Sequence, residues 1–178
     1  MKLVKSLKCA VKGIIYTIKN ERNMRIHTVI AFYVMLASCF FHLSVVKYAI
    51  LMLTIGGVMS LEMLNTSVEA IIDICAKEYN SVARVAKDIA AGAVMIFSAV
   101  AAAVGFVLFS DMYAYIGMWA YFRCHKILLI LLIGSIFISV IYIRSGPAEI
   151  KNRLISIVKT VKRRVYRLVG SKKMGRKG

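Results

Sequence analysis

Residues 48–75 read YAILMLTIGGVMSLEMLNTSVEAIIDIC, and the rest of the chain is best understood from this stretch. Its first half is uncharged and apolar. Its second half adds three carboxylates and an asparagine to a mostly apolar background: Glu62, Asn65, Glu69 and Asp73. A carboxylate at the centre of a bilayer costs roughly 2.5–3.5 kcal/mol, so the acidic half should lie near one membrane face. We predict a helix that crosses the bilayer with its apolar half and ends close to the membrane surface.

Three more runs without formal charge predict further helices of the same kind. They cover residues 26–46, 89–110 and 127–143. The hydrocarbon core of a bilayer is about 30 Å thick and takes about 20 helical residues to cross. The sequence therefore predicts an all-α membrane protein, with transmembrane helices near 27–46, 48–75, 84–110 and 125–143.

The first 20 residues predict a surface helix. Leucine, valine and isoleucine recur at helical spacing, while lysines occupy the opposite side. Lys12 and Lys19 interrupt the apolar stretch, and no small-residue cleavage site follows, so we interpret the segment as a retained part of the protein and not as a signal peptide. An amphipathic helix of this kind lies in the membrane interface.

The distribution of charge predicts the topology. The chain has 178 residues, of which 60% are hydrophobic, yet its formal net charge is +17, which excludes an ordinary soluble enzyme. Residues 1–27 carry a net charge of +6 and residues 144–178 carry +11, while the middle of the chain sums to zero. Because Lys and Arg concentrate on the cytoplasmic side, we predict a multi-pass protein of the cell membrane with both termini in the cytoplasm. The aromatic-rich connection at 111–125 then lies outside.

The polar residues of 62–73 have the spacing of one helix face. Positions i, i+3, i+7 and i+11 project in a single stripe, and here they are occupied by Glu62, Asn65, Glu69 and Asp73. A row of carboxylates repels itself unless a cation lies among them, and a set of oxygen ligands suits Mg²⁺. Mg²⁺ in turn suggests a phosphate group, which Arg84 and Lys87 would help to neutralise. A solvated polar face explains any one of these residues, but it does not explain the four together.

These residues resemble a known family. The run EMLNTSVEAIID at 62–73, followed by KDIAAGAV at 87–94, is similar to the conserved blocks of the prokaryotic integral-membrane diacylglycerol kinase and undecaprenol kinase family. The run GIIYTIKNERNMRIH at 13–27 is similar to its first block, in the form of the Gram-positive branch, where undecaprenol is the usual substrate. The resemblance covers about residues 3–108, and it is specific because three separated blocks occur in order.

The resemblance implies a homotrimeric lipid kinase that uses ATP and Mg²⁺. It implies that Glu62 is the general base and that Asn65 positions the reacting groups. It implies that Glu21 and Glu69 hold Mg²⁺. Further contacts to the nucleotide are implied at five positions: Glu78, Tyr79, Asn80, Lys87 and Asp88. The chain departs from the family pattern at Lys2, where relatives often have arginine, and at Asn80, where histidine or another polar residue is common.

The resemblance also divides the chain. Residues 1–110 form the predicted membrane lipid kinase domain, 111–143 an extracytoplasmic aromatic loop with the fourth transmembrane helix, and 144–178 a basic cytoplasmic tail. Ser145-Gly146-Pro147 should break the fourth helix from the tail. Apolar residues recur every three or four positions in the tail, with basic residues between them. This pattern predicts a basic amphipathic helix that binds anionic lipids of the inner leaflet. Nucleic-acid binding is less favoured, because the tail has no recognised fold for it.

Two function classes follow. The first is ATP-dependent phosphorylation of a lipid alcohol, with undecaprenol ahead of diacylglycerol, although the apolar surfaces do not choose between the two lipids. Since the chain has no Walker A or kinase glycine-rich loop, carboxylate-bound metal and lysines on helices would have to hold the phosphates. The second is a non-catalytic membrane anchor or a small cation-conducting protein, in which the acidic stripe binds cations without turnover.

Overall fold

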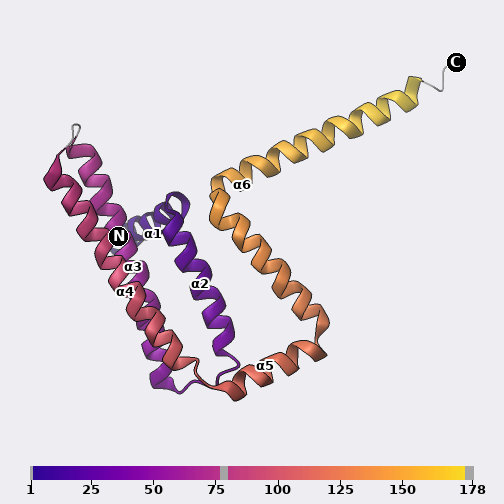
Figure 1. Ribbon diagram of the computed structural model, residues 1–178. Helices are drawn as coiled ribbons and strands as arrows, with labels where there is room; N and C mark the ends of the chain where they lie inside the picture. Colours follow the sequence, from indigo (N-terminus) through magenta and orange to yellow (C-terminus); the bar gives the residue numbers. More distant parts are fainter. Residues whose placement is uncertain (1, 77–79, 175–178) are drawn as a thin grey trace.

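The computed structural model describes residues 2–76 and 80–174, and all the regular structure in them is helical (Figure 1). These residues form six helices, in chain order α1 (Lys2–Asn20), α2 (Arg22–Ser38), α3 (Val45–Cys75), α4 (Ser81–Leu108), α5 (Met112–Cys124) and α6 (Lys126–Met174). Many of their large apolar side chains are exposed, as expected of a chain whose outer surface faces lipid. The predicted all-α class is confirmed.

Three helices of the described chain are long and apolar enough to cross a membrane. They are α3, α4 and the first part of α6, Lys126–Pro147, with mean hydropathies of 1.5, 2.3 and 2.6. Their lengths of 31, 28 and 22 residues exceed the roughly 20 that a bilayer requires. The helices predicted near 48–75, 84–110 and 125–143 are therefore confirmed.

The helix predicted near 27–46 differs from the observed one. Helix α2 begins at Arg22 and ends at Ser38, where the buried Ser38 hydroxyl donates a hydrogen bond of 2.7 Å to the Met35 carbonyl. Turns follow, and His42 takes a positive φ of 44°. At 1.5 Å per residue the 17 residues of α2 extend about 25 Å, less than the hydrocarbon core. The uncharged run at 26–46 thus contains a helix, a turn and the start of α3.

Helices α3 and α4 form an antiparallel hairpin, which lies on one side of α2 in Figure 1. A Cβ atom added at Gly57 would overlap the ring of Phe97, so the absence of a side chain at this position lets the two helices approach closely. Asn80 begins α4, because its side-chain oxygen accepts hydrogen bonds from the backbone N–H groups of Val82 at 2.9 Å and Ala83 at 3.3 Å. The hairpin is the framework that carries the acidic stripe.

The aromatic segment at 111–125 is a helix and not the predicted loop. Asp111 caps the N-terminus of α5 by accepting a hydrogen bond of 2.9 Å from the N–H of Tyr113. Ring contacts join this part of the chain to the α2–α3 turn: the centroid of Phe41 lies 4.8 Å from that of Phe109 and 4.9 Å from that of Tyr115. Phe41 belongs to a buried apolar cluster with Leu43, Leu51 and Leu108. The sequence showed the aromatic residues but not the cap that makes them helical.

Two bends set the directions of α1 and α6. Only Glu21, in extended conformation with φ −95° and ψ 124°, separates α1 from α2. Helix α6 bends at Gly146, whose φ of 66° and ψ of 163° are non-helical, next to Pro147. The predicted break at Ser145-Gly146-Pro147 is thus confirmed as a kink, and Figure 1 shows the second half of α6 pointing away from the other helices.

The N-terminal segment is helical, as predicted. The apolar residues Leu3, Leu7 and Val11 of α1 are exposed, and Thr17 is the residue of this helix that is buried. An exposed apolar stripe on a lysine-rich helix suits the membrane interface. Its placement in that interface stays a prediction.

Candidate functional site

Glu62 lies at the centre of the candidate site. Its side chain is 1% exposed, and its Oε2 atom has no hydrogen-bond partner among the described residues. Around it, α3 contacts both α1 and α2. A buried carboxylate without partners is costly. A site of this kind is completed when a proton, a cation or a ligand hydroxyl reaches the free oxygen.

Glu21 and Glu69 flank Glu62. The charges of both residues act on the Glu62 carboxyl. Glu69 lies on the same helix, two turns away, whereas Glu21 comes from the joint between α1 and α2. Glu21, Glu62 and Glu69 therefore interact electrostatically in the folded chain, although Glu21 is 41 positions from Glu62 along the sequence. Their roles as base and metal ligands remain predictions from the resemblance.

The remaining residues of the stripe extend outward from Glu62. The Asn65 amide donates a hydrogen bond of 3.0 Å to Oε1 of Glu69, while its own Oδ1 is buried and has no partner in the described part of the chain. The Thr66 hydroxyl donates a bond of 2.9 Å to the Glu62 carbonyl. Asn65 and Thr66 are buried, Glu69 is half-buried and Asp73 is exposed. The stripe is thus a path from the interior to the surface, with two buried oxygen atoms left unsatisfied at its inner end.

The oxygen donors fit Mg²⁺ bound together with phosphate. No three His, Cys, Asp or Glu side chains within the described ranges form a complete metal site. Mg²⁺ is usually held by one or two carboxylates, with phosphate oxygens and water filling its other positions. Glu21 and Glu69, whose charges act on Glu62, are two carboxylates of the type that Mg²⁺ prefers. Oδ1 of Asn65 and Oε2 of Glu62, which have no hydrogen-bond partner among the described residues, are two further hard oxygen atoms on α3.

Lys87 on α4 is paired with a member of the stripe. Its ammonium group forms an ion pair with Oδ1 of Asp73 across the α3–α4 hairpin. Both side chains are accessible, with 36% and 68% of their surfaces exposed, so the pair contributes little to stability. Asp88, which follows Lys87, is exposed. An accessible lysine at the outer end of the stripe can leave the aspartate to contact an anionic ligand.

Of the three nucleotide contacts predicted at the α3–α4 connection, one falls within the described residues. Glu78 and Tyr79 lie outside the described residues. Asn80 is described, and its side-chain oxygen caps α4. A nucleotide contact by Asn80 would therefore use its amide nitrogen.

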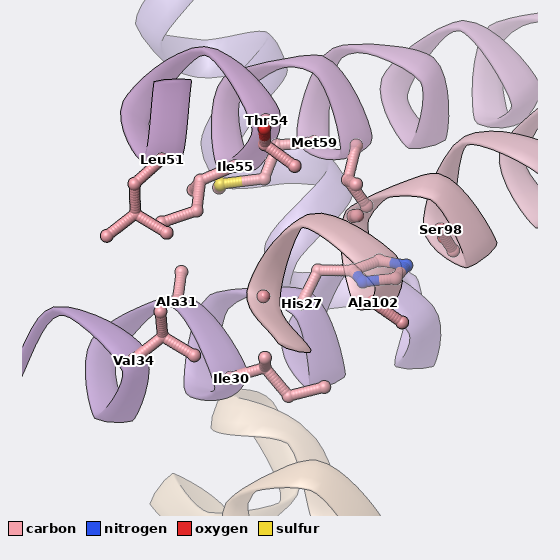
Figure 2. A pocket seen from close by; sticks show the side chains of 13 residues that line it. His27, Ile30, Ala31, Val34, Leu51, Thr54, Ile55, Met59, Ser98 and Ala102 are labelled. Carbon is pink, nitrogen blue, oxygen red and sulfur yellow. The ribbon is translucent and has the colours of Figure 1, made fainter. Parts of the chain in front are cut away.

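An apolar cavity of about 270 Å³ lies between α2, α3 and α4 (Figure 2). Among its lining residues, Val58 and Met59 lie on α3 about one turn before Glu62. His27 and Ser98 add polar groups, and the Ser98 hydroxyl is buried and finds no hydrogen-bond partner within the described residues. Sequence reasoning missed this cavity. The small residues Ala101, Ala102 and Gly105, which leave room on α4, were the available signal.

Comparison with known proteins gives a consistent result. The family model of prokaryotic diacylglycerol kinase matches residues 8–109. The chain is similar to an undecaprenol kinase of Bacillus subtilis (strain 168), with 37% identity over 105 residues that span 59% of this chain and 85% of the relative. It is also similar to a diacylglycerol kinase of Synechocystis sp., with 39% identity over 104 residues that span 58% of this chain and 59% of the relative. The chain belongs to the prokaryotic diacylglycerol kinase family.

Proposed function

We propose that this protein phosphorylates a membrane lipid alcohol with ATP, undecaprenol being the first choice and diacylglycerol the second. Family membership supports the class of lipid kinase. The observation that carries the proposal is the buried Glu62, whose Oε2 has no partner among the residues that the structure describes and which lies about one turn from an apolar cavity. A lipid hydroxyl is attached to an apolar chain, which needs an apolar cavity, and it must lose its proton to react, which needs a proton acceptor.

Glu62 acts as general base in this proposal. As the lipid oxygen attacks the γ-phosphorus, its hydroxyl proton passes to Oε2 of Glu62. A new oxygen–phosphorus bond forms, the bond between the γ-phosphorus and the β,γ-bridging oxygen breaks, and ADP leaves. Such base catalysis contributes about 10²–10⁴-fold to the rate. Asn65 positions the reacting groups from the same helix face, and its amide holds Oε1 of Glu69.

The anionic phosphates need cationic partners. Glu21 and Glu69 would hold Mg²⁺, which would supply positive charge to the phosphates. Lys87 contributes a second cation once it leaves Asp73. Asn80 and Asp88, at the start of α4, contribute further contacts to the nucleotide. Glu78 and Tyr79 keep the nucleotide contacts that the resemblance implies. This division keeps ATP in water while the lipid hydroxyl stays at the edge of the membrane.

The cavity between α2, α3 and α4 supports a linear apolar chain as the substrate's tail. Its walls are mostly aliphatic, and the relative from Bacillus subtilis is named undecaprenol kinase. An isoprenoid alcohol therefore comes first, and a diacylglycerol is the alternative because the second relative is named diacylglycerol kinase.

The cellular setting is part of the proposal. Both termini lie in the cytoplasm, since the positive charge is concentrated at the two ends of the chain. The basic tail binds anionic lipids of the inner leaflet. The active unit is a homotrimer, and the tail is not a nucleic-acid binder.

Reconstituted membranes provide the test. The full-length protein in vesicles should transfer ³²P from Mg[γ-³²P]ATP to undecaprenol, and more slowly to dioleoylglycerol. Glu62→Gln should abolish transfer, while Ser67→Ala, on the exposed side of the same helix, should retain it. Full activity of Glu62→Gln would overturn the role of Glu62. Failure with both alcohols, together with cation flux in the same vesicles, would favour the membrane anchor or cation conductor instead.

A further inference from the structure

Arg25 is a buried cation on the first turns of α2. Its side chain is 7% exposed, which is rare for arginine unless its donors are matched. It lies four residues after Glu21, whose carbonyl accepts the Arg25 N–H at 3.3 Å. The site described above does not use this guanidinium group.

The end of α1 supplies the first acceptors. Arg25 Nη1 donates to the Lys19 carbonyl at 3.0 Å and to the Ile18 carbonyl at 3.5 Å. Helix α1 ends at Asn20, so these are carbonyls of a last turn, which a helix leaves without intrahelical partners and which attract cations. Arg25 therefore clamps the end of α1 against the start of α2, with Glu21 between them.

The kink of α6 supplies the other acceptor. Arg25 Nε donates to the Ile143 carbonyl at 3.2 Å. In a regular helix that carbonyl would accept from residue 147, which is proline and has no N–H. A Cβ atom added at Gly146 would lie 3.3 Å from Arg25 Nη1 and 3.7 Å from the Lys19 carbonyl oxygen. The kink thus frees a carbonyl and brings it against the guanidinium group.

We propose that Arg25 is a positioning residue for Glu21. Arg25 fixes the joint between α1 and α2, and the kinked α6 in turn fixes Arg25 through the Ile143 carbonyl. This inference rests on the proposed function, in which Glu21 binds Mg²⁺ with ATP. The family match ends at residue 109, so α6 lies outside the matched region and braces the kinase core from there. A displacement of a ligating group by about 1 Å is enough to cost up to 10²-fold in rate.

The kinetic test uses full-length variants in vesicles. Pro147→Ala returns an N–H to the Ile143 carbonyl, and Gly146→Val disfavours the positive φ and crowds Arg25. Both should raise the KM for MgATP about tenfold and leave the KM for the lipid alcohol unchanged. Arg25→Lys should do the same, because an ammonium group cannot reach carbonyls on two sides as the guanidinium does.

Tyr33→Phe is the matched control. The Tyr33 hydroxyl bonds with Ser135 at 3.0 Å and Ser139 at 3.1 Å, so it also joins α2 to α6, but away from the joint. Its loss should leave the KM for MgATP unchanged. An equal rise of that KM in Tyr33→Phe would overturn the assignment to the kink.

A second measurement does not depend on activity. Spin labels at Lys8→Cys and Ile30→Cys, both exposed, report the distance from α1 to α2 after the four exposed native cysteines are replaced by serine. With labelled chains diluted in an excess of unlabelled ones, so that distances are measured within one protomer, we expect one narrow distance distribution, broadened by Gly146→Val and Pro147→Ala. An unchanged distribution, or a broadened one without a change in KM, would overturn the inference. A wild-type protein inactive on every lipid would instead overturn the proposed function, and the distances alone would then decide whether the brace exists.

Discussion

Glu62 and Arg25 are both buried charged residues, but their surroundings differ. Arg25 donates to carbonyls of α1 and α6, from Ile18 and Lys19 on one side to Ile143 on the other. Glu62 has an oxygen with no partner in the described chain, beside the equally unpartnered Oδ1 of Asn65. A satisfied buried charge holds a structure together, whereas an unsatisfied one marks a place where a ligand or proton completes the site.

The strongest test of this contrast is Glu62→Gln. We expect a loss of at least about 10²-fold in kcat, because the amide cannot take the proton. Stability should not fall, since the substitution removes a buried charge without removing a partner of another group. Phosphate transfer to undecaprenol and thermal unfolding in detergent measure the two effects. A large fall in stability would mean that Glu62 is structural, as Arg25 is.

Arg25→Met should show the opposite balance. It leaves three carbonyls without their donor, and hydrogen bonds to a charged group contribute about 1.5–3 kcal/mol each. Water near the membrane surface can hydrogen-bond to some of the freed carbonyls, so we expect the free energy of unfolding to fall by about 3 kcal/mol and not by the full sum. Denaturant unfolding in mixed micelles provides the measurement. Unchanged stability would show that the three bonds contribute no net free energy.

Asp73→Asn tests an accessible charge. The Lys87–Asp73 pair is exposed at both partners, so breaking it should cost less than about 1 kcal/mol of stability. A lysine released from Asp73 should bind MgATP at least as well as before. The comparison of interest is the salt dependence of unfolding, which should decrease in the variant. Destabilisation on the scale of Arg25→Met would contradict the assignment of this pair to the surface.

Tyr33→Phe should have the smallest effect. Hydrogen bonds between helices in membranes average about 0.6 kcal/mol, and Ser135 keeps its hydrogen bond of 2.7 Å to the Leu132 carbonyl. We expect a change in the free energy of unfolding near this value. A loss several times larger would mean that the hydrogen bonds of Tyr33, and not those of Arg25, make the main contribution to the packing of α2 against α6.

Helical periodicity was enough to predict the acidic stripe. The spacing of Glu62, Asn65 and Glu69 places them on one face of any regular helix, and the structure confirms that face. Glu21 was found through the family resemblance, because its approach to Glu62 depends on how α1 and α2 meet. No local pattern encodes such a meeting of distant segments.

Helix ends and supports were harder to predict. The end of α2 at Ser38 and the cap at Asp111 depend on single hydrogen bonds inside apolar or aromatic runs, which hydropathy does not detect. In the sequence Arg25 counted only toward the positive charge of the N-terminal region. Its acceptors lie on α1 and 118 residues away on α6, so its role emerges only when the kink at Pro147 is seen beside it.

Glu21, the single residue between α1 and α2, is the point at which the angle between the two helices is set. If α1 tilts relative to α2, the change is taken up mainly by the two backbone torsions of Glu21, because the residues on either side are fixed in helices. Those torsions also aim the Glu21 carboxylate. The surface helix and this acidic side chain therefore turn together, and whatever sets the angle of α1 on the membrane also sets the direction of that carboxylate.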